Sequence, residues 1–147
     1  MTAVEVTVSE YKEPKASVEQ VVEWADTDAA GHHHNSAIVR WVEAAEAKLM
    51  RELGLSGYFP VAPRVQQVLN FRGKLWFGQQ VIASVWVEKL GESSLTLGFE
   101  VEGRPCDRSP GGRAADGTIT TVHVPSGSAG SAPWPREIRD ALTGGAL

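Results

Sequence analysis

The sequence predicts an α+β domain in which an antiparallel sheet of five strands wraps around one long helix. One segment, residues 36–53, has apolar residues at helical spacing over about half of its circumference, so this helix has to be largely enclosed. Five other segments have strand patterns, and turn-forming residues separate them. A single helix combined with a run of consecutive strands is typical of an antiparallel α+β arrangement.

The helical segment is the clearest element. Its apolar residues recur at spacings of three and four, at Ile38, Trp41, Val42, Ala45, Leu49 and Leu53. Gly54 follows as a helix stop, because glycine readily takes the conformation that ends a helix. Either Asn35 or Ser36 is expected to cap the first turn, since their side chains can accept hydrogen bonds from free backbone N–H groups.

The expected strands lie on both sides of this helix in the sequence. They are residues 16–24, 61–71, 80–90, 93–102 and 113–124. Gly78, Gly91 and the loop at 103–112 mark turns between them. Residues 135–142 have the pattern of a short helix. We expect one domain over residues 1–147, with 1–14 and 125–147 loosely attached, because the chain contains no repeat and no second core pattern.

The composition of the chain excludes several classes of protein. Hydrophobic residues make up 42% and charged residues 22% of the 147 residues, which is typical of a globular domain. No apolar run approaches the roughly 20 residues that span a bilayer, and the N-terminus has no signal-peptide pattern. The net charge of -4 argues against nucleic-acid binding. The single cysteine, Cys106, suits a reducing compartment, so we expect a cytoplasmic protein without membrane contact.

The stretch from Trp24 to Glu46, WADTDAAGHHHNSAIVRWVEAAE, is the most informative about chemistry. It places carboxylates, imidazoles and an amide on a turn that leads into the N-terminus of the enclosed helix. Unpaired N–H groups there carry partial positive charge and can stabilise a developing oxyanion. A nearby carboxylate can activate water or attack directly, and a histidine can position a substrate or transfer protons. The stretch therefore indicates a site for acyl transfer or hydrolysis.

Other interpretations of these residues are open at this point. Asp28 can serve only to cap a turn, and Asp26 is expected to be structural. Three adjacent histidines suggest a metal site, which needs three or four converging ligands. Adjacent side chains diverge in an extended segment, so only His32 and His34 can share a side, with Asp28 beside them and His123 distant. We therefore expect no metal.

The pattern Asp-x-Asp-x-x-Gly-His-x-x-Asn, followed by an aliphatic-Arg-Trp-x-Glu helix, resembles the motif of the 4-hydroxybenzoyl-CoA thioesterase group in the hotdog superfamily. Phe71 with Gly78 before a long strand, and Gly-Glu-Ser-Ser at 91–94, fit the same group. The resemblance spans residues 16–124. It implies a hotdog fold, with the five-stranded sheet around one central helix. It also implies a homodimer whose sheets pair edge to edge, or a homotetramer.

The resemblance also implies roles for three residues. Asp28 corresponds to the family's nucleophile or general base, and His32 to a histidine found in many relatives, including acyl-carrier-protein thioesterases. Asn35 occupies the position whose backbone N–H polarises the thioester carbonyl. The chain departs from the family pattern at His33 and His34, which replace commoner aliphatic or asparagine residues. A usual tyrosine is missing from residues 36–38, and Gln79 stands where relatives carry aspartate.

Secondary catalytic candidates are His34 and two glutamates of the helix, because a different branch of hotdog enzymes uses a helix glutamate as its carboxylate. Glu46 falls inside the apolar arc and Glu43 at its margin. Burial would raise the pKa of Glu46 unless the carboxylate is paired. Further candidates for contacts with the substrate are Arg72, Lys74, Ser93 and Ser94. The two serines lack the setting of a serine hydrolase.

The function implied by the resemblance is hydrolysis of an acyl-CoA or acyl-carrier-protein thioester. Asp28 would attack or activate water, the helix N-terminus would hold the oxyanion, and no cofactor is needed beyond the coenzyme A of the substrate. Two alternatives are a hotdog dehydratase or cyclase on a carrier-bound acyl chain, and a non-catalytic acyl-binding protein. Release of free thiol distinguishes hydrolysis from a new double bond or ring, and from binding without turnover.

Overall fold

The computed structural model describes residues 14–144. The elements in chain order are β1 (Lys15–Val21), the 3-10 turn η1 (Trp24–Asp26), α2 (Asn35–Glu52), the 3-10 turn η2 (Phe59–Val61), β2 (Arg64–Phe71), β3 (Gln80–Leu90), β4 (Ser94–Gly103), β5 (Gly112–Val122) and α3 (Arg136–Leu142). Strand, long helix and four further strands follow in the predicted order. The expectation of a loose arm at 1–14 lies almost wholly outside the described residues.

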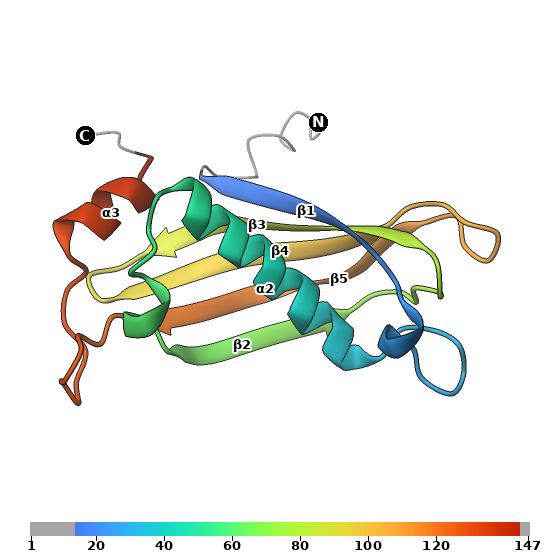
Figure 1. Ribbon diagram of the computed structural model, residues 1–147, viewed down its shortest axis with the longest axis horizontal. Helices are drawn as coiled ribbons and strands as arrows, with labels where there is room; N and C mark the ends of the chain where they lie inside the picture. Colours follow the sequence, from blue (N-terminus) through green and yellow to red (C-terminus); the bar gives the residue numbers. More distant parts are fainter. Residues whose placement is uncertain (1–13, 145–147) are drawn as a thin grey trace, which may run out of the picture.

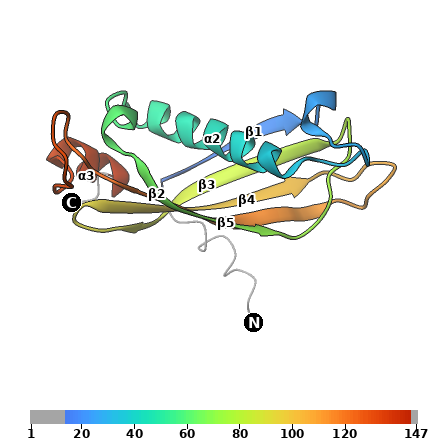
Figure 2. The same cartoon turned by 90° about the horizontal axis from the view of Figure 1, so that it is seen from below.

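The five strands form one antiparallel sheet in the order β1-β3-β4-β5-β2. In Figure 1, α2 crosses the sheet diagonally, and Figure 2 shows the sheet as one layer with α2 on a single face. The sheet curves but does not close, because β1 and β2 are its two edges and do not pair with each other. The predicted α+β fold, with one long helix against a five-stranded antiparallel sheet, is confirmed.

The core lies between α2 and the concave face of the sheet. Every second residue of a strand points to the same face, and in β3 and β4 these positions are apolar. Register aligns them across the sheet, with Val87 opposite Leu97 and Leu97 opposite Ile119. From α2 the buried residues are Ala37, Ile38, Trp41, Val42, Ala45, Glu46, Leu49 and Met50. The wide apolar arc is therefore buried as predicted, and Glu46 is the one charged side chain within it.

Two strands are shorter than predicted at one end. β1 ends at Val21, and Trp24 lies in η1 with 70% of its surface exposed. The chain turns there because the backbone N–H of Glu23 donates to the buried carboxylate of Asp26. β2 begins at Arg64 rather than at residue 61. Pro63 precedes it, and proline has no N–H with which to extend the sheet.

The cap of α2 differs from the expectation. Asn35 is the first helical residue, and His34 occupies the capping position with its backbone extended. The Nδ1 atom of His34 accepts a hydrogen bond from the N–H of Ser36 at 3.2 Å. The prediction that Asn35 or Ser36 caps the helix is therefore wrong, and the imidazole does so instead.

The C-terminal segment also differs from the expectation that residues 125–147 are loosely attached. Trp134, Ile138 and Leu142 are buried, and α3 packs at the end of the sheet where β3 turns into β4. The indole N–H of Trp134 donates to the carbonyl of Ser94. Within the described part of the tail, which ends at residue 144, the apolar side chains of α3 explain this attachment.

Candidate active site

The loop between η1 and α2 carries Asp28 and is held on both sides. Residue Thr27 pairs with His33, and His32 pairs with Trp76, as isolated antiparallel bridges. Across the turn, the N–H of Asp28 donates to the carbonyl of His32 at 2.9 Å. Gly31 has a φ of 92°, which only glycine adopts without strain, so the tight turn depends on it. These contacts fix the loop as a short hairpin before the helix.

A second anchor ties the same loop to α2. The carboxylate of Asp26 is buried and forms an ion pair with Arg40, on the helix. The carbonyl of Asp26 accepts from the N–H of His34 at 2.6 Å. The structural role expected for Asp26 agrees with this geometry. The position of Asp28 relative to the start of α2 is therefore set by covalent, hydrogen-bond and ion-pair restraints together.

The carboxylate of Asp28 is partly accessible, with 36% of its side-chain surface exposed. Its Oδ1 atom accepts a hydrogen bond from the backbone N–H of Ala30 at 2.8 Å. This bond is the largest of the effects that lower the pKa of Asp28, and the nearby His32 adds to it. Asp28 is therefore ionised at neutral pH, which both a nucleophile and a general base require.

His32 lies beside this carboxylate. Its Nδ1 atom is 3.8 Å from Oδ2 of Asp28, which is beyond direct hydrogen bonding but close enough for a charge interaction when the imidazole is protonated. The ring packs edge-on against Trp76, with centroids 5.7 Å apart. On that tryptophan the guanidinium of Arg108 is stacked at 4.7 Å. His32 is thus held in place by aromatic packing.

The N-terminus of α2 offers one free backbone donor. The N–H of Ser36 is bonded to the His34 ring, and that of Ala37 to the His34 carbonyl at 2.9 Å. Within residues 14–144, no protein group accepts a hydrogen bond from the N–H of Asn35. This group lies at the positive end of the helix dipole. Asn35 is therefore the residue of the first turn that can donate to an oxyanion.

His33 is a structural residue that the sequence pattern did not identify. Its side chain is buried, and its Nδ1 atom accepts a hydrogen bond from the N–H of Leu75 at 3.1 Å. Because Nδ1 accepts, the neutral ring carries its proton on Nε2, which is buried without a partner in the described part of the chain. Burial is the main cause that lowers the pKa of His33. The ring therefore joins the Asp28 loop to the β2–β3 connection in its neutral form.

The two helix glutamates lie further along α2. Glu46 is only 2% exposed and pairs with Arg64 at 2.8 Å, while the more exposed Glu43 is 3.4 Å from the same guanidinium. Burial raises the pKa of Glu46, although Arg64 opposes that shift. Glu46 follows Asn35 by eleven residues, which is about 16 Å along a helix. The structure thus brings Glu43 and Glu46 together with Arg64 and leaves them apart from Asp28.

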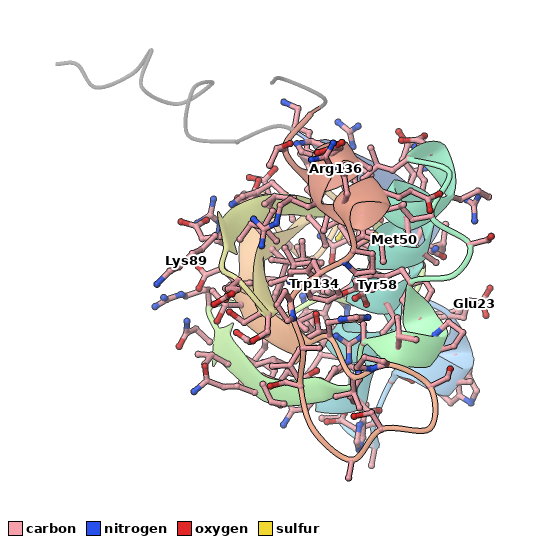
Figure 3. All side chains as sticks on the ribbon, turned by 90° about the vertical axis from the view of Figure 1, so that its left-hand side faces the viewer. Glu23, Met50, Tyr58, Lys89, Trp134 and Arg136 are labelled. Atoms are coloured by element: carbon pink, nitrogen blue, oxygen red, sulfur yellow. The ribbon has the colours of Figure 1, made fainter. Side chains whose placement is uncertain are left out.

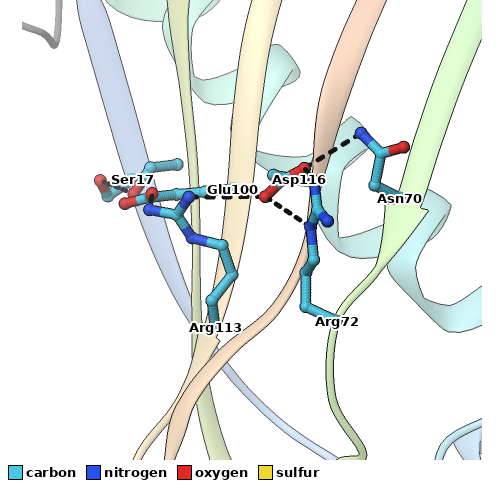
Figure 4. Close-up of polar contacts among 7 residues, drawn as sticks. Ser17, Asn70, Arg72, Glu100, Arg113 and Asp116 are labelled. Atoms are coloured by element: carbon cyan, nitrogen blue, oxygen red, sulfur yellow. Dashed lines mark hydrogen bonds and ion pairs between the residues drawn. The ribbon is translucent and has the colours of Figure 1, made fainter.

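The residues named for substrate contacts are spread over the sheet. Arg72 holds Asp116 by two hydrogen bonds, and Asn70 and Arg113 contact the same carboxylate (Figure 4). Arg113 also pairs with Glu100. This network lies on the face of the sheet opposite α2. It lowers the pKa of Asp116, chiefly through Arg72.

The other three candidates for substrate contacts do not lie together. Lys74 is exposed in the connection before β3. Ser93 and Ser94 lie at the start of β4, at the end of the sheet near α3, whereas the Asp28 loop lies at the other end (Figure 1). The structure therefore places Asp28 beside His32, with His34 and Asn35 further along the same loop at the start of α2. Arg72, Lys74, Ser93 and Ser94 lie elsewhere in the same subunit.

A surface pocket of about 320 Å³ adjoins the Asp28 loop. It is lined by Trp24, Ala29, Ala30, Gly31, Trp76, Phe77 and Arg108. Trp24 and Phe77 pack edge-on at 5.6 Å and remain largely exposed. Buried Gln79 fixes the connection before β3, because it accepts from the N–H of Trp76 and donates to the carbonyl of Arg104. The sequence did not predict this pocket, since its walls come from segments that only the fold brings together.

Two further properties concern metal ligands and membrane spans in the described part of the chain. Among residues 14–144, no group of three or more histidine, cysteine, aspartate or glutamate side chains converges in a way that could hold a metal ion. No helix in the same range has the length and apolar character needed to cross a membrane.

Comparison with known proteins gives a consistent family. A model of the thioesterase-like superfamily matches residues 22–142 of the chain. A search of curated proteins finds no match.

Solved structures of similar fold are numerous. A 1,4-dihydroxy-2-naphthoyl-CoA thioesterase from Synechocystis matches with a TM-score of 0.76 at 16% identity, over 87% of this chain and 95% of that one. A thioesterase from Thermus thermophilus, complexed with coenzyme A and Zn, matches with 0.74 at 24%, over 88% and 95%. A 4-hydroxybenzoyl CoA thioesterase, as an aspartate-to-asparagine mutant complexed with 4-hydroxybenzoyl CoA, matches with 0.75 at 13%, over 87% and 98%.

Proposed function

Because the chain belongs to the thioesterase-like superfamily and has the hotdog fold, we propose that it hydrolyses an acyl-CoA thioester at the junction of the Asp28 loop and α2. The observation that carries this proposal is that the loop leading into α2 carries two complementary groups. One is the ionised carboxylate of Asp28, and the other is the free N–H of Asn35 at the start of the helix. An electrophilic carbonyl bound between them would meet a base or nucleophile and an oxyanion donor together.

The reaction follows from these two groups. In the general-base route, Asp28 takes a proton from water as the water oxygen attacks the thioester carbon. The carbonyl oxygen becomes an oxyanion that accepts the hydrogen bond of the Asn35 N–H. Collapse of the tetrahedral intermediate breaks the C–S bond, and the protonated Asp28 returns the proton to the leaving thiolate. The products are a carboxylic acid and free coenzyme A. In the nucleophilic route Asp28 itself attacks the thioester carbon, and the C–S bond breaks to release the coenzyme A thiolate and leave a mixed anhydride. Water then hydrolyses the anhydride to the carboxylic acid and free Asp28, and the thiolate takes up the remaining proton.

His32 has a positioning role in this scheme. Its ring is fixed against Trp76, and Nδ1 lies 3.8 Å from the carboxylate. One water molecule between the two side chains would hydrogen-bond to both, at a separation that a direct bond cannot span. His32 thereby orients the attacking water toward the carbonyl.

We propose coenzyme A rather than a carrier protein as the thiol. Two of the similar solved structures are complexes, one with coenzyme A and one with 4-hydroxybenzoyl CoA. The pocket beside Asp28 has aromatic walls from Trp24, Trp76 and Phe77 and a cation in Arg108. Such a surface suits a neutral, largely apolar arm with anionic groups beyond it.

The functional unit is proposed to be a homodimer joined through β2. This strand is an eight-residue edge, and its exposed side chains include Val65, Val68 and Phe71. An exposed apolar edge strand is a template for pairing with another chain. The register shift in β2 lies at its first residues, between Arg64 and Gln66, so the strand is regular from Gln66 to Phe71. The opposite edge, β1, carries Lys15 and Glu19, which disfavour pairing. A second copy joined at β2 extends the sheet, and it would place partner residues near the open side of α2.

The experiment that tests the activity measures thiol release from a panel of aliphatic and aromatic acyl-CoA substrates. Asp28→Asn keeps an oxygen for the Ala30 N–H, so the turn is preserved while the charge is lost. We expect kcat/KM to fall by at least about 100-fold, as for the removal of a group that acts in the transition state. Asp140→Asn on α3 is the matched control and retains activity. A loss below about tenfold for Asp28→Asn would refute a central role for this carboxylate.

A further inference from the structure

A second pocket lies at the opposite end of α2 from Asp28. It has a volume of about 420 Å³, within the range of small-molecule sites. It is lined by Gly54, Leu55, Ser56, Gly57, Tyr58, Val61, His123, Pro125, Ser126, Pro135, Glu137 and Ile138. The 18 residues of α2 separate the two regions by about 27 Å. No step of the proposed hydrolysis involves this pocket.

His123 is the buried polar side chain of this pocket, and its ring is fixed. Only 6% of the residue is exposed, and the ring lies against Trp134 with centroids 5.2 Å apart. Its Nδ1 atom is 3.1 Å from the carbonyl oxygen of Ala132 and 3.0 Å from that of Pro133. A carbonyl oxygen can only accept, so Nδ1 carries the proton. The neutral ring therefore presents the lone pair of Nε2 as a hydrogen-bond acceptor.

This acceptor has no protein partner. Within residues 14–144, no donor lies within hydrogen-bond distance of Nε2 of His123. The backbone of the residue is fully engaged, because its N–H donates to Ser93 and its carbonyl accepts from Ala132. The residue is only 6% exposed, but Nε2 is not among its fully buried atoms, so this nitrogen stays accessible to a donor. The pocket supplies the space in which a donor can reach it.

The other lining residues indicate which ligand groups, besides the donor, the pocket can accommodate. Leu55, Val61 and Ile138 give apolar contacts, and two prolines give flat rigid surfaces. Tyr58 offers only its ring, because its hydroxyl is already bonded to Thr121 at 2.7 Å. Figure 3 shows Tyr58 beside Trp134 beneath α3, and their rings stack at 5.9 Å.

The negative charge of Glu137, which lines the pocket, restricts the class of ligand further. Glu137, in the first turn of α3, is exposed and lines the opening. A carboxylate there disfavours an anionic ligand by repulsion. We propose that this pocket is a second binding site, separate from Asp28, for a neutral ring-containing molecule whose O–H or N–H group donates to Nε2 of His123.

The probes for this site are phenol and anisole, which differ by a methyl group that removes the donor. Titration of the ¹⁵N-labelled protein with each, followed by amide chemical shifts, gives both the affinity and the location. We expect phenol to bind about five- to tenfold more tightly than anisole, the ratio for one neutral hydrogen bond. Benzoate, an anion of similar shape, should bind more weakly than phenol. The shifts should map to residues 54–61 and 123–138.

A variant that fills the pocket tests the location of binding without substituting His123. A Cβ atom added at Gly57 meets no atom within 4 Å, and this glycine has no positive φ, so Gly57→Leu fills the pocket without backbone strain. It should abolish phenol binding, while Gly130→Leu, at another unobstructed glycine, should not.

Equal affinities for phenol and anisole would overturn the proposal, as would phenol shifts that persist unchanged in Gly57→Leu. Because the measurement uses no thioester, a negative result leaves the proposed hydrolysis untouched.

Discussion

Asp28 serves the turn and the proposed reaction with different atoms. Its Oδ1 accepts from Ala30, and its Oδ2 lies toward His32. The two interpretations that the sequence allowed, a turn cap and a catalytic carboxylate, are therefore compatible, because the hydrogen bond that caps the turn also keeps the carboxylate ionised. The same local contact gives both structure and reactivity.

His33 makes stability depend on pH. Its pKa is lowered in the folded protein, so between pH 6.5 and that lower value the unfolded chain binds a proton that the folded chain does not. Stability is therefore complete above about pH 6.5 and falls as the pH decreases below it. Protonation would also set a ring N–H against the N–H of Leu75. His32, His34 and Asp28 face this ring and contribute to its charge environment.

The test is urea unfolding of the wild type and of His33→Asn across about pH 8 to pH 5. Asparagine can accept from Leu75 but does not titrate, so we expect the variant to lose less stability on acidification than the wild type. The other histidines are present in both proteins, so their contributions cancel when the two pH profiles of unfolding free energy are subtracted. Parallel pH profiles for the two proteins would rule out His33 as the source.

Glu46 depends on Arg64 because it is buried. Removal of one partner of a buried ion pair costs about 3 kcal/mol, since the other charge remains desolvated. We expect Arg64→Leu to lower the free energy of unfolding by about this amount at pH 8. The deficit should shrink as the pH decreases from about 8 to about 5. Burial raises the pKa of Glu46, and the substitution removes Arg64, which lowers that pKa, so protonation of the buried carboxyl removes the desolvated charge.

The double variant Glu46→Leu/Arg64→Leu is the control for that measurement. It removes both charges and should be more stable at pH 8 than Arg64→Leu alone. A single variant as stable as the wild type at both pH values would show that the ion pair contributes nothing to folding.

At the level of elements, the pattern of apolar residues predicted the long helix and all five strands. The predicted ends of two strands were wrong, because local contacts there override the apolar pattern. Pro63 delays the start of the strand expected at 61–71 until Arg64, and the Glu23–Asp26 contact turns the chain before Trp24. The pocket beside Asp28 could not be predicted, because Trp24, Phe77 and Arg108 meet only through the tertiary fold.

The cap of α2 gives a prediction at the same scale. Asn35 has the residue type that is most favoured at this position, which is why the sequence indicated it. The extended backbone of His34 and its bond to Ser36 assign the cap to the imidazole. We expect His34→Ala to cost about 1 kcal/mol in unfolding free energy, and Asn35→Ala only a few tenths. Urea denaturation of both variants would contradict this assignment if Asn35→Ala were the more damaging.

For the whole molecule, the proposed dimer depends on the edge strand β2. The N–H of Arg72, just after β2, donates to the carbonyl of Ala114 in β5. Alternation along the strand therefore directs the N–H groups of Gln67, Leu69 and Phe71 away from the sheet. Gln67→Pro removes one outward donor, and we expect it to weaken the proposed dimer. Gln67→Ala keeps the donor and should leave the dimer intact.

Light scattering coupled to size-exclusion chromatography measures the masses of these two variants. We expect a dimer mass for the wild type and for Gln67→Ala, and a monomer fraction that increases with dilution for Gln67→Pro. A wild-type protein that is monomeric at all concentrations would refute an interface at β2.

The central claim is that the free N–H of Asn35 and the carboxylate of Asp28 act on one carbonyl, and a proline tests it most directly. Asn35 is the first residue of α2, where proline is well tolerated, and His34 already has the extended backbone that precedes proline. Asn35→Pro therefore removes the N–H and little else, whereas Asn35→Ala removes only the side chain. With folding verified by circular dichroism, we predict that kcat/KM for acyl-CoA hydrolysis falls at least about 100-fold in Asn35→Pro and stays within about threefold in Asn35→Ala. Equal activity in a folded Asn35→Pro and in Asn35→Ala would contradict the account.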